Sequence, residues 1–392
     1  MIFPKFTFRS VHRFPLATLW LLGLLAFCAL AVPTKLSAQP QAVGGQFQVN
    51  TYTTFSQSDP DVAMAPDGSF IVVWESTGAD GVDTSGSEIL AKRFAADGSP
   101  VGQEFLVNSL TSGSQRTPRV AMNASREFLV VWEDPAVGGS DPDIRARRYN
   151  SSGNPFGSEI IVTSGDDNGR PGVDLRDDGS FVVSWVIGTS NTRARRYDSS
   201  GNPLGSVIAL DGSALATDPV SVAALPNGEV AFAWQGASSL PLRLYDNSGN
   251  ELVTLDLAGT SGDRKPEIAA RGDGDFIVSW ETLRSSDADG DERSVQALRF
   301  ASDGTPQGQI FQVNSYTTGD QDNASVAVLE DGDAFVVWET ESDDNEPDPA
   351  IRGAFVDSNG AFIGAELEIN DVTAGNQLVP RIATDGQNRF VV

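Results

Sequence analysis

The chain has 392 residues, of which 53 are acidic and 27 basic, so its formal net charge is −26. A surface of that charge repels nucleic acid and anionic lipid, and neither is an expected partner. The only Cys (Cys28) and the only His (His12) fall in the first 38 residues. The remainder therefore excludes a disulfide, a Ser-His-Asp triad, a thiol nucleophile and a His-ligated zinc site.

Residues 1–38 have the pattern of a signal peptide. Basic residues precede an apolar run over 16–32, and the small pair Ser37-Ala38 follows. We expect a signal helix that is removed before Gln39, although the run is also long enough for an uncleaved signal anchor. A lipoprotein signal at Cys28 is a weaker alternative, because Phe27 is bulky. Each alternative places the rest of the chain outside the cytoplasm, secreted or at the cell surface, and confines membrane contact to the N-terminal segment.

The part that remains, residues 39–392, is more acidic still. It holds 23 basic residues against the same 53 acidic ones, which is a net charge of −30. Such a charge favours solubility and divalent cations. Without disulfides, its stability has to come from a hydrophobic core, and a chain of this length can build one.

One phrase, residues 62–75, recurs along this part of the chain. It predicts two short strands around a Pro-Asp-Gly turn, the second strand ending in Trp74. A third strand ending in an aromatic residue and a fourth strand such as 104–108 complete each unit. No segment has sustained helical periodicity, so an all-β fold is predicted. The predicted units are 51–108, 109–162, 163–210, 211–257, 258–314, 315–370 and a partial unit, 371–392.

The second strand of each unit predicts how the units pack. Residues 70–74 are apolar at five consecutive positions rather than alternating, so both faces of that strand have to be covered. Four-stranded antiparallel blades arranged around an axis satisfy this requirement, which predicts a β-propeller. A linear stack of sheets and a string of separate sandwich domains are the alternatives.

The ends of the chain bear on the number of blades. Residues 43–50 match a fourth strand with nothing before it, and residues 381–392 match a first and second strand with nothing after them. Six blades and a seventh that is incomplete or shared between the termini would close the ring. We therefore expect seven blades, and the abrupt end at Val392 suggests that the chain is a fragment.

The phrases Phe-Gln-Val-Asn, Pro-Asp-Gly and Phe-Ile-Val-Val-Trp-Glu resemble the tandem propeller-type repeats of large, uncharacterised secreted bacterial proteins. The resemblance covers about residues 43–392. A more distant resemblance links the Pro-Asp-Gly turn to TolB-like and WD-type blades, although the WD signature and the sialidase Asp-box are absent. The resemblance implies a repeat type and no activity.

Two recurrent features are interpreted as structural. Each Trp ends an apolar strand, so we expect the Trp side chains in the core between blades rather than on a ligand surface. Arg residues near the end of the third strand are expected to pair with the Glu that follows Trp in four units, namely Glu75, Glu133, Glu281 and Glu339. A ring of anion-binding guanidinium groups is the alternative for these arginines.

The loop after the fifth Trp carries the candidate metal site. Asp287, Asp289, Asp291 and Glu292 place oxygen ligands around a Gly, as a Ca²⁺ site requires, but the complete EF-hand loop is missing. Solvated loop acids are the alternative. No other cofactor is predicted.

No catalytic motif is present, so we expect a non-enzymatic module. The predicted function is a secreted or cell-surface propeller that acts in binding, adhesion or spacing, with an unidentified protein or polysaccharide as partner. The alternative is a carbohydrate-active enzyme that uses paired carboxylates. No pair can be selected from 53 acidic residues.

Overall fold

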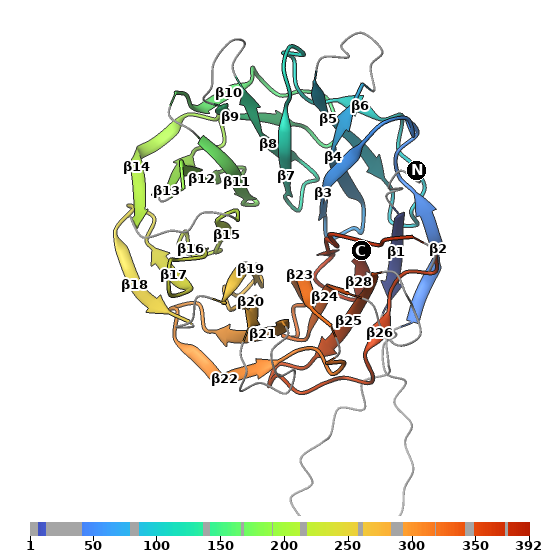
Figure 1. Ribbon diagram of the computed structural model, residues 1–392. Coiled ribbons are helices and arrows are strands. Elements are labelled where there is room, and N and C mark those ends of the chain that lie inside the picture. Colours follow the sequence, from blue (N-terminus) through green and yellow to red (C-terminus); the bar gives the residue numbers. More distant parts are fainter. Residues whose placement is uncertain are drawn as a thin grey trace, which may run out of the picture.

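The structure is a computed structural model that describes residues 7–12, 41–78, 86–135, 142–165, 168–189, 191–211, 218–257, 262–283, 293–317, 319–341, 349–372 and 375–392. The regular elements of these residues are β-strands, and all paired strands are antiparallel. Four-stranded sheets are arranged radially around a central axis, as in a propeller (Figure 1). The predicted all-β propeller of four-stranded antiparallel blades is confirmed.

Six blades are built from four consecutive strands each, with the first strand at the axis and the fourth at the rim (Figure 1). Blade 1 contains β3 (Gln57–Met64), β4 (Phe70–Thr77), β5 (Ser87–Phe94) and β6 (Phe105–Leu106); blade 2 contains β7 (Arg116–Met122), β8 (Phe128–Pro135), β9 (Pro142–Tyr149) and β10 (Ile160–Thr163); blade 3 contains β11 (Asn168–Leu175), β12 (Phe181–Ile187), β13 (Asn191–Tyr197) and β14 (Pro203–Asp211). Blade 4 contains β15 (Ser221–Ala224), β16 (Val230–Ala233), β17 (Pro241–Tyr245) and β18 (Glu251–Asp256); blade 5 contains β19 (Arg264–Ala270), β20 (Phe276–Leu283), β21 (Arg293–Phe300) and β22 (Pro306–Gln312); blade 6 contains β23 (Gln321–Val328), β24 (Ala334–Thr340), β25 (Ala350–Val356) and β26 (Leu367–Glu368).

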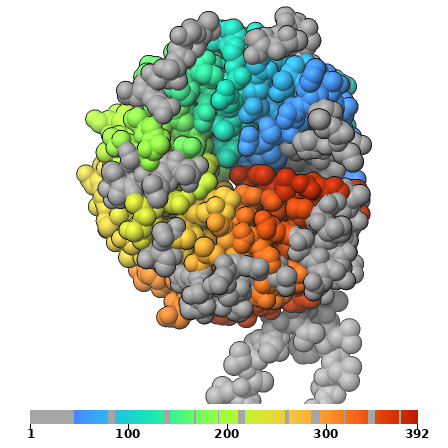
Figure 2. Space-filling view, viewed as in Figure 1, coloured from blue at the N-terminus to red at the C-terminus, as the bar shows by residue number. Residues whose placement is uncertain are grey.

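The prediction of seven blades, the last incomplete or shared between the termini, is wrong in its count, because the described residues build six blades as repeats of consecutive strands. The two ends of the chain form a sheet of another kind, which closes the ring between blades 6 and 1. Its order is β2 (Gln41–Gln48), β1 (Thr7–His12), β28 (Arg389–Val391) and β27 (Ala383–Thr384). The first and last strands of the chain consequently lie side by side (Figure 1). In the space-filling view, the blue residues of blade 1 and the red C-terminal residues are neighbours (Figure 2).

Of the N-terminal segment for which a signal helix is predicted, the structure describes only residues 7–12, and these are not helical; the apolar run over 16–32 lies outside the described residues. Residues 7–12 form strand β1, which pairs with β28 on one side and β2 on the other. The physical reason is that β28 would otherwise expose unpaired backbone groups at a sheet edge. Residues 13–40, with the predicted cleavage site, lie outside the described residues. Within the described part of the chain, no helix has the length and apolar character needed to cross a membrane.

The second strand of each blade is buried on both faces, as its unbroken apolar run predicts. The side chains of Phe70 to Trp74 are at most 4 % exposed. All six Trp side chains at this position are at most 2 % exposed: Trp74, Trp132, Trp185, Trp234, Trp280 and Trp338. Alternate residues of one strand pack against different neighbouring sheets, so that Val72 and Val73 belong to separate hydrophobic clusters. The core is therefore a series of layers between adjacent sheets, and the prediction that the Trp residues are core is confirmed.

Aromatic pairs connect the second and third strands within the blades. Phe128 lies opposite Tyr149, and their rings stack with centroids 4.6 Å apart. Equivalent pairs stack in blades 1, 3, 5 and 6. Cross-strand aromatic pairs of this kind stabilise a sheet by more than their buried area alone. They explain why the third strand ends in an aromatic residue.

The third-strand arginines do not pair with the Glu that follows Trp, so that prediction is wrong. Arg148 donates to the backbone carbonyl oxygens of Ser199 and Ser200, in the outer turn of the next blade. Arg93, Arg196 and Arg299 likewise reach backbone carbonyls of the next blade. A guanidinium has five donors in a fixed arrangement, and here it donates hydrogen bonds to backbone carbonyl oxygens in a turn of the next blade. These arginines join neighbouring blades.

Candidate binding cavity on the propeller axis

Five innermost strands, namely β3, β7, β11, β19 and β23, carry an irregularity near their start. The pairing register shifts between Arg116 and Arg119 in β7, and Thr117 within the shift has a positive φ of 48°. Five other residues at the equivalent position have φ between 48° and 55°: Asp59, Arg170, Lys265, Asn323 and Val379. Left-handed backbone is unfavourable for residues other than Gly, so something must hold these bulges in place.

The Glu that follows Trp holds the bulge of the next sheet around the ring. The backbone N–H of Arg170 donates to Glu133 Oε1 at 2.6 Å, and the N–H of Val379 donates to Glu339 Oε2 at 3.2 Å. Glu281 accepts the N–H of Asn323 in the same way, and Glu75 that of Thr117. The carboxylate therefore satisfies a donor that the bulge withdraws from the strand ladder.

Blade 3 has no Glu after its Trp and supports this account. Val186 occupies that position, and the bulge position of blade 4 is Pro219. Proline has no backbone N–H, so no acceptor is needed there. Val186 is buried and packs in one cluster with Val220 of blade 4.

The bulges direct a repeated set of side chains towards the axis. Two residues after each bulge position, the side chains line the central cavity: Asp61, Arg119, Gly172, Ser221, Glu267, Ser325 and Arg381. Two residues further on, the lining residues are Ala63, Ala121, Asp174, Ala223, Ala269, Ala327 and Ala383. The first set is varied and mostly polar, whereas the second is alanine at every position except Asp174. The cavity they enclose has a volume of about 1000 Å³.

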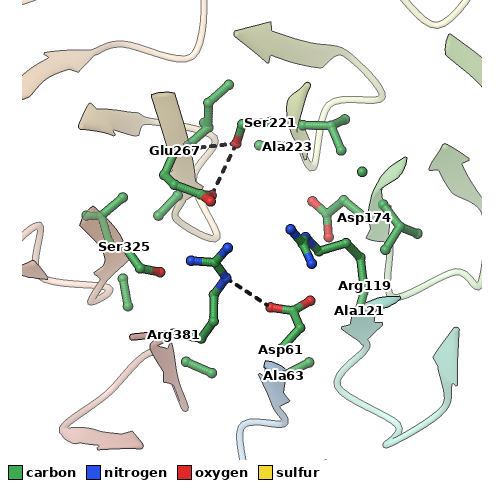
Figure 3. A pocket seen from close by; sticks show the side chains of 18 of the residues that line it. Asp61, Ala63, Arg119, Ala121, Asp174, Ser221, Ala223, Glu267, Ser325 and Arg381 are labelled. Atoms are coloured by element: carbon green, nitrogen blue, oxygen red, sulfur yellow. Dashed lines mark hydrogen bonds and ion pairs between the residues drawn. The ribbon is translucent and has the colours of Figure 1, made fainter. Parts of the chain in front are cut away.

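Asp61, Arg119 and Arg381 form a charged group on one side of this cavity (Figure 3). Asp61 Oδ2 accepts the backbone N–H of Val120 at 2.8 Å, and Asp61 Oδ1 lies 3.9 Å from Nε of Arg381. Burial raises the pKa of Asp61, while Arg119 and Arg381 oppose that rise. Burial also lowers the pKa of Arg119, and the positive charge of Arg381 lowers it further.

Glu267 and Asp174 reach the cavity from blades 5 and 3 (Figure 3). The hydroxyl of Ser221 lies 3.5 Å from Glu267 Oε2, and burial raises the pKa of Glu267. Asp174 accepts the backbone N–H of Ala224 at 2.7 Å, and burial raises the pKa of Asp174 to about 6. Both carboxyl groups therefore have a stronger tendency to be protonated near neutral pH than an exposed acid has.

Gly172 explains why blade 3 departs from the pattern. A Cβ atom at this glycine would lie 2.3 Å from the carbonyl oxygen of Val220 and 2.5 Å from Ser184 Oγ. Blade 3 thus has no space for a side chain at the first lining position, and its polar group stands two residues later, at Asp174. Position 174 is the one place in the second set where the repeat is broken by a charge.

These cavity residues are not among the candidate site residues predicted from the sequence. The signal that identifies them is a variable residue at a constant place in the repeat, because the lining position precedes a Val or Ile in every unit. The predicted Ca²⁺ ligands Asp287, Asp289, Asp291 and Glu292 lie outside the described residues. Among the residues that are described, no group of three or more His, Cys, Asp or Glu side chains has a metal-binding arrangement.

No protein-family model matches this chain, and no curated protein matches it. Solved structures do resemble it. A protein of unknown function from Dyadobacter fermentans is 12 % identical with a TM-score of 0.48, the alignment covering 86 % of this chain and 93 % of that one. A prolyl endopeptidase is 15 % identical with a TM-score of 0.49, covering 86 % of this chain and 45 % of that one. The NanB sialidase of Streptococcus pneumoniae is 10 % identical with a TM-score of 0.43, covering 83 % and 63 %. Similarities at this level assign no activity to the chain.

Proposed function

We propose that this chain is an exported binding protein whose central cavity takes a small polyhydroxylated ligand, such as a segment of a saccharide. The observation that carries the proposal is the convergence of Asp61, Asp174, Glu267 and two arginines, from different sheets, on one cavity of about 1000 Å³. A cavity with a few convergent polar groups of perturbed pKa is the usual form of a ligand site. The described lining contains no aromatic residue, so recognition rests on hydrogen bonds rather than stacking.

The export part of the proposal rests on the N-terminal pattern and on the acidic, nearly cysteine-free composition. A saccharide suits the cavity because its hydroxyl groups donate to carboxylates and accept from guanidinium groups. The same chemistry applies to a polysaccharide partner, of which only a short segment or an end would enter the cavity.

A glycan-binding screen with the purified protein tests this proposal. Asp174→Asn and Glu267→Gln keep the size of each side chain but remove its charge, and both are expected to weaken binding of any glycan that scores. Glu368→Gln is the matched control, because Glu368 is an exposed carboxylate of β26 outside the cavity. Binding that all three variants retain equally would place the ligand elsewhere and reject the cavity as the site.

Carboxylate-based glycoside hydrolysis is the second candidate function, and one observation favours it. Asp174, with its pKa raised to about 6, holds a proton at mildly acidic pH, as a general acid must. Asp61 or Glu267 would then activate water from another side of the cavity. Release of reducing sugar that Asp174→Asn abolishes, while Glu368→Gln leaves it unchanged, would support hydrolysis. Binding without release of sugar would leave the chain a binding protein.

A further inference from the structure

Basic side chains are concentrated around the cavity of this acidic protein. Six of the 27 Lys and Arg residues line it, compared with seven of the 53 Asp and Glu residues. Since acidic residues outnumber basic ones about two to one in the whole chain, the cavity is relatively enriched in positive charge. The net charge of the protein does not explain this enrichment. The surface as a whole is negative and would repel an anionic ligand at long range.

Several of these guanidinium groups lack a close carboxylate partner among the described residues. Arg119 and Arg170 have no Asp or Glu oxygen within 4.0 Å there, and the single ion pair of Arg381 is at 3.9 Å, near the limit of such a contact. Arg119 donates instead to the carbonyl oxygen of Pro118 at 2.7 Å, and Arg381 to that of Pro380 at 3.1 Å. Each guanidinium has five donors, so most of them stay available.

The direction of these side chains matters as much as their number. Arg119 and Arg381 extend into the cavity from two inner segments, with Asp61 between their bases (Figure 3). The lowered pKa of Arg119 has burial as its main cause and the charge of Arg381 as its second, so the two cations repel each other. Asp61, Glu267 and Asp59 offset part of this repulsion at Arg119, and a further anion bound between the two partly buried cations would offset more of it.

We propose that the cavity selects an acidic saccharide, whose carboxylate binds Arg119 and Arg381 while its hydroxyl groups bind Asp174 and Glu267. This inference rests on the proposed saccharide-binding function. A simple inorganic anion fits less well, because the seven acidic residues that line the same cavity, Asp61, Asp174 and Glu267 among them, repel it. A neutral saccharide fits less well too, because it adds no counter-charge for the two guanidinium groups beyond the nearby Asp61 and Glu267. A uronate unit satisfies both requirements, since a guanidinium binds a carboxylate through two parallel hydrogen bonds.

Arg170 also lines the cavity and is expected to contribute to binding. Its backbone N–H is held by Glu133, which fixes the bulge and with it the place of the side chain. Its guanidinium has no hydrogen-bond or ion-pair partner among the described residues. We expect it to guide the acidic unit inward, and therefore to affect the salt dependence of binding.

Titration calorimetry with the full-length protein tests the inference. The probes are oligomers of galacturonate, glucuronate and mannuronate, each compared with its own methyl ester, which has the same hydroxyl groups without the charge. At low salt we expect at least one acid form to bind roughly tenfold or more tightly than its ester. Arg119→Gln and Arg381→Gln should remove that difference, and added salt should reduce it.

Two further variants keep the test valid if a cavity variant fails to fold. Arg170→Gln removes another charge from the lining, and its expected effect is a smaller salt dependence. Arg126→Gln is the matched control, because Arg126 is 53 % exposed and outside the cavity; it should leave binding unchanged. Esters or neutral glycans that bind as tightly as the acids would overturn this inference and leave saccharide binding standing. If no saccharide of either kind binds, the proposed function falls as well.

Discussion

The backbone N–H of Arg170 in blade 3 donates to Glu133 Oε1 of blade 2 at 2.6 Å, and this hydrogen bond joins one blade to the bulge of the next. Replacing Glu133 by Ala leaves that N–H without an acceptor in a partly buried position. We expect the free energy of unfolding to fall by about 1–3 kcal/mol, the usual cost of an unsatisfied buried donor. Urea unfolding, compared with the unchanged protein, measures it. An unaltered midpoint would mean that water replaces the carboxylate at no cost.

Position 186 provides the reciprocal test. Val186→Glu introduces the residue that four other units have, but the facing bulge position is Pro219, which cannot donate. A buried carboxylate without a donor is strongly unfavourable, so this variant should be less stable than Glu133→Ala. The two are compared by the same urea titration. Equal or greater stability than the unchanged protein would contradict the role assigned to the Glu residues.

The indole groups of Trp74 and Trp132 make a matched pair. Trp74 Nε1 donates to Gln57 Oε1 at 3.0 Å, whereas Nε1 of Trp132 has no hydrogen-bond partner among the described residues. Both side chains are fully buried, so a change to Phe removes similar apolar contacts in each blade. We expect Trp74→Phe to cost about 1 kcal/mol more than Trp132→Phe, which is the contribution of the hydrogen bond. Thermal melts of the two variants, analysed at a common temperature, decide the question.

Stability should depend on pH through Glu281. Burial raises the pKa of Glu281 from its ordinary 4.5 to about 7, although Lys265 and Arg264 oppose the rise. Between these two pH values the folded state binds more protons than the unfolded state, so this group lowers stability as pH rises from 4.5 to 7. Glu281→Gln keeps an acceptor for the N–H of Asn323 and removes the titration. It should flatten the pH dependence of unfolding in that interval, and an unchanged slope would assign the dependence to other groups.

The predicted Ca²⁺ site at Asp287, Asp289, Asp291 and Glu292 stays a prediction, and melting tests it directly. Millimolar Ca²⁺ should raise the melting midpoint relative to a sample with chelator. When Ca²⁺ is at a hundred times its dissociation constant, the free energy of unfolding should increase by about 2.7 kcal/mol. Asp289→Asn combined with Asp291→Asn should abolish the effect. The same midpoint with and without Ca²⁺ would show that these acids are solvated loop residues.

The amino-acid sequence is sufficient to predict the blades, but not the residues that line the cavity. The uninterrupted apolar run from Phe70 to Trp74 implies a strand covered on both faces, because alternate side chains of a strand point in opposite directions. That local pattern is sufficient to predict strands, turns and buried Trp residues. It also explains why the third strand ends in an aromatic residue, since the pairing of the two strands places Phe128 opposite Tyr149.

The partner of Glu133 could not be obtained in this way. Its acceptor role depends on the bulge of a different sheet, 37 residues later in the chain, and nothing local to Glu133 indicates it. The predicted pairing with a third-strand Arg assumed contacts within one sheet, whereas the observed contact runs between sheets. The absence of Glu at position 186 matches the absence of a backbone N–H at Pro219. Only the fold shows that these two positions face each other.

The repeat and the buried faces of its strands are properties of short segments, and the amino-acid order alone determined them. Closure of the ring and the contents of the cavity depend on segments that meet only after folding. Arg381 reaches Asp61 across 320 positions of sequence because β27 lies beside β3 around the axis. Pairing of β1 with β28 has the same origin, since a sheet edge accepts the strand that the tertiary structure brings to it.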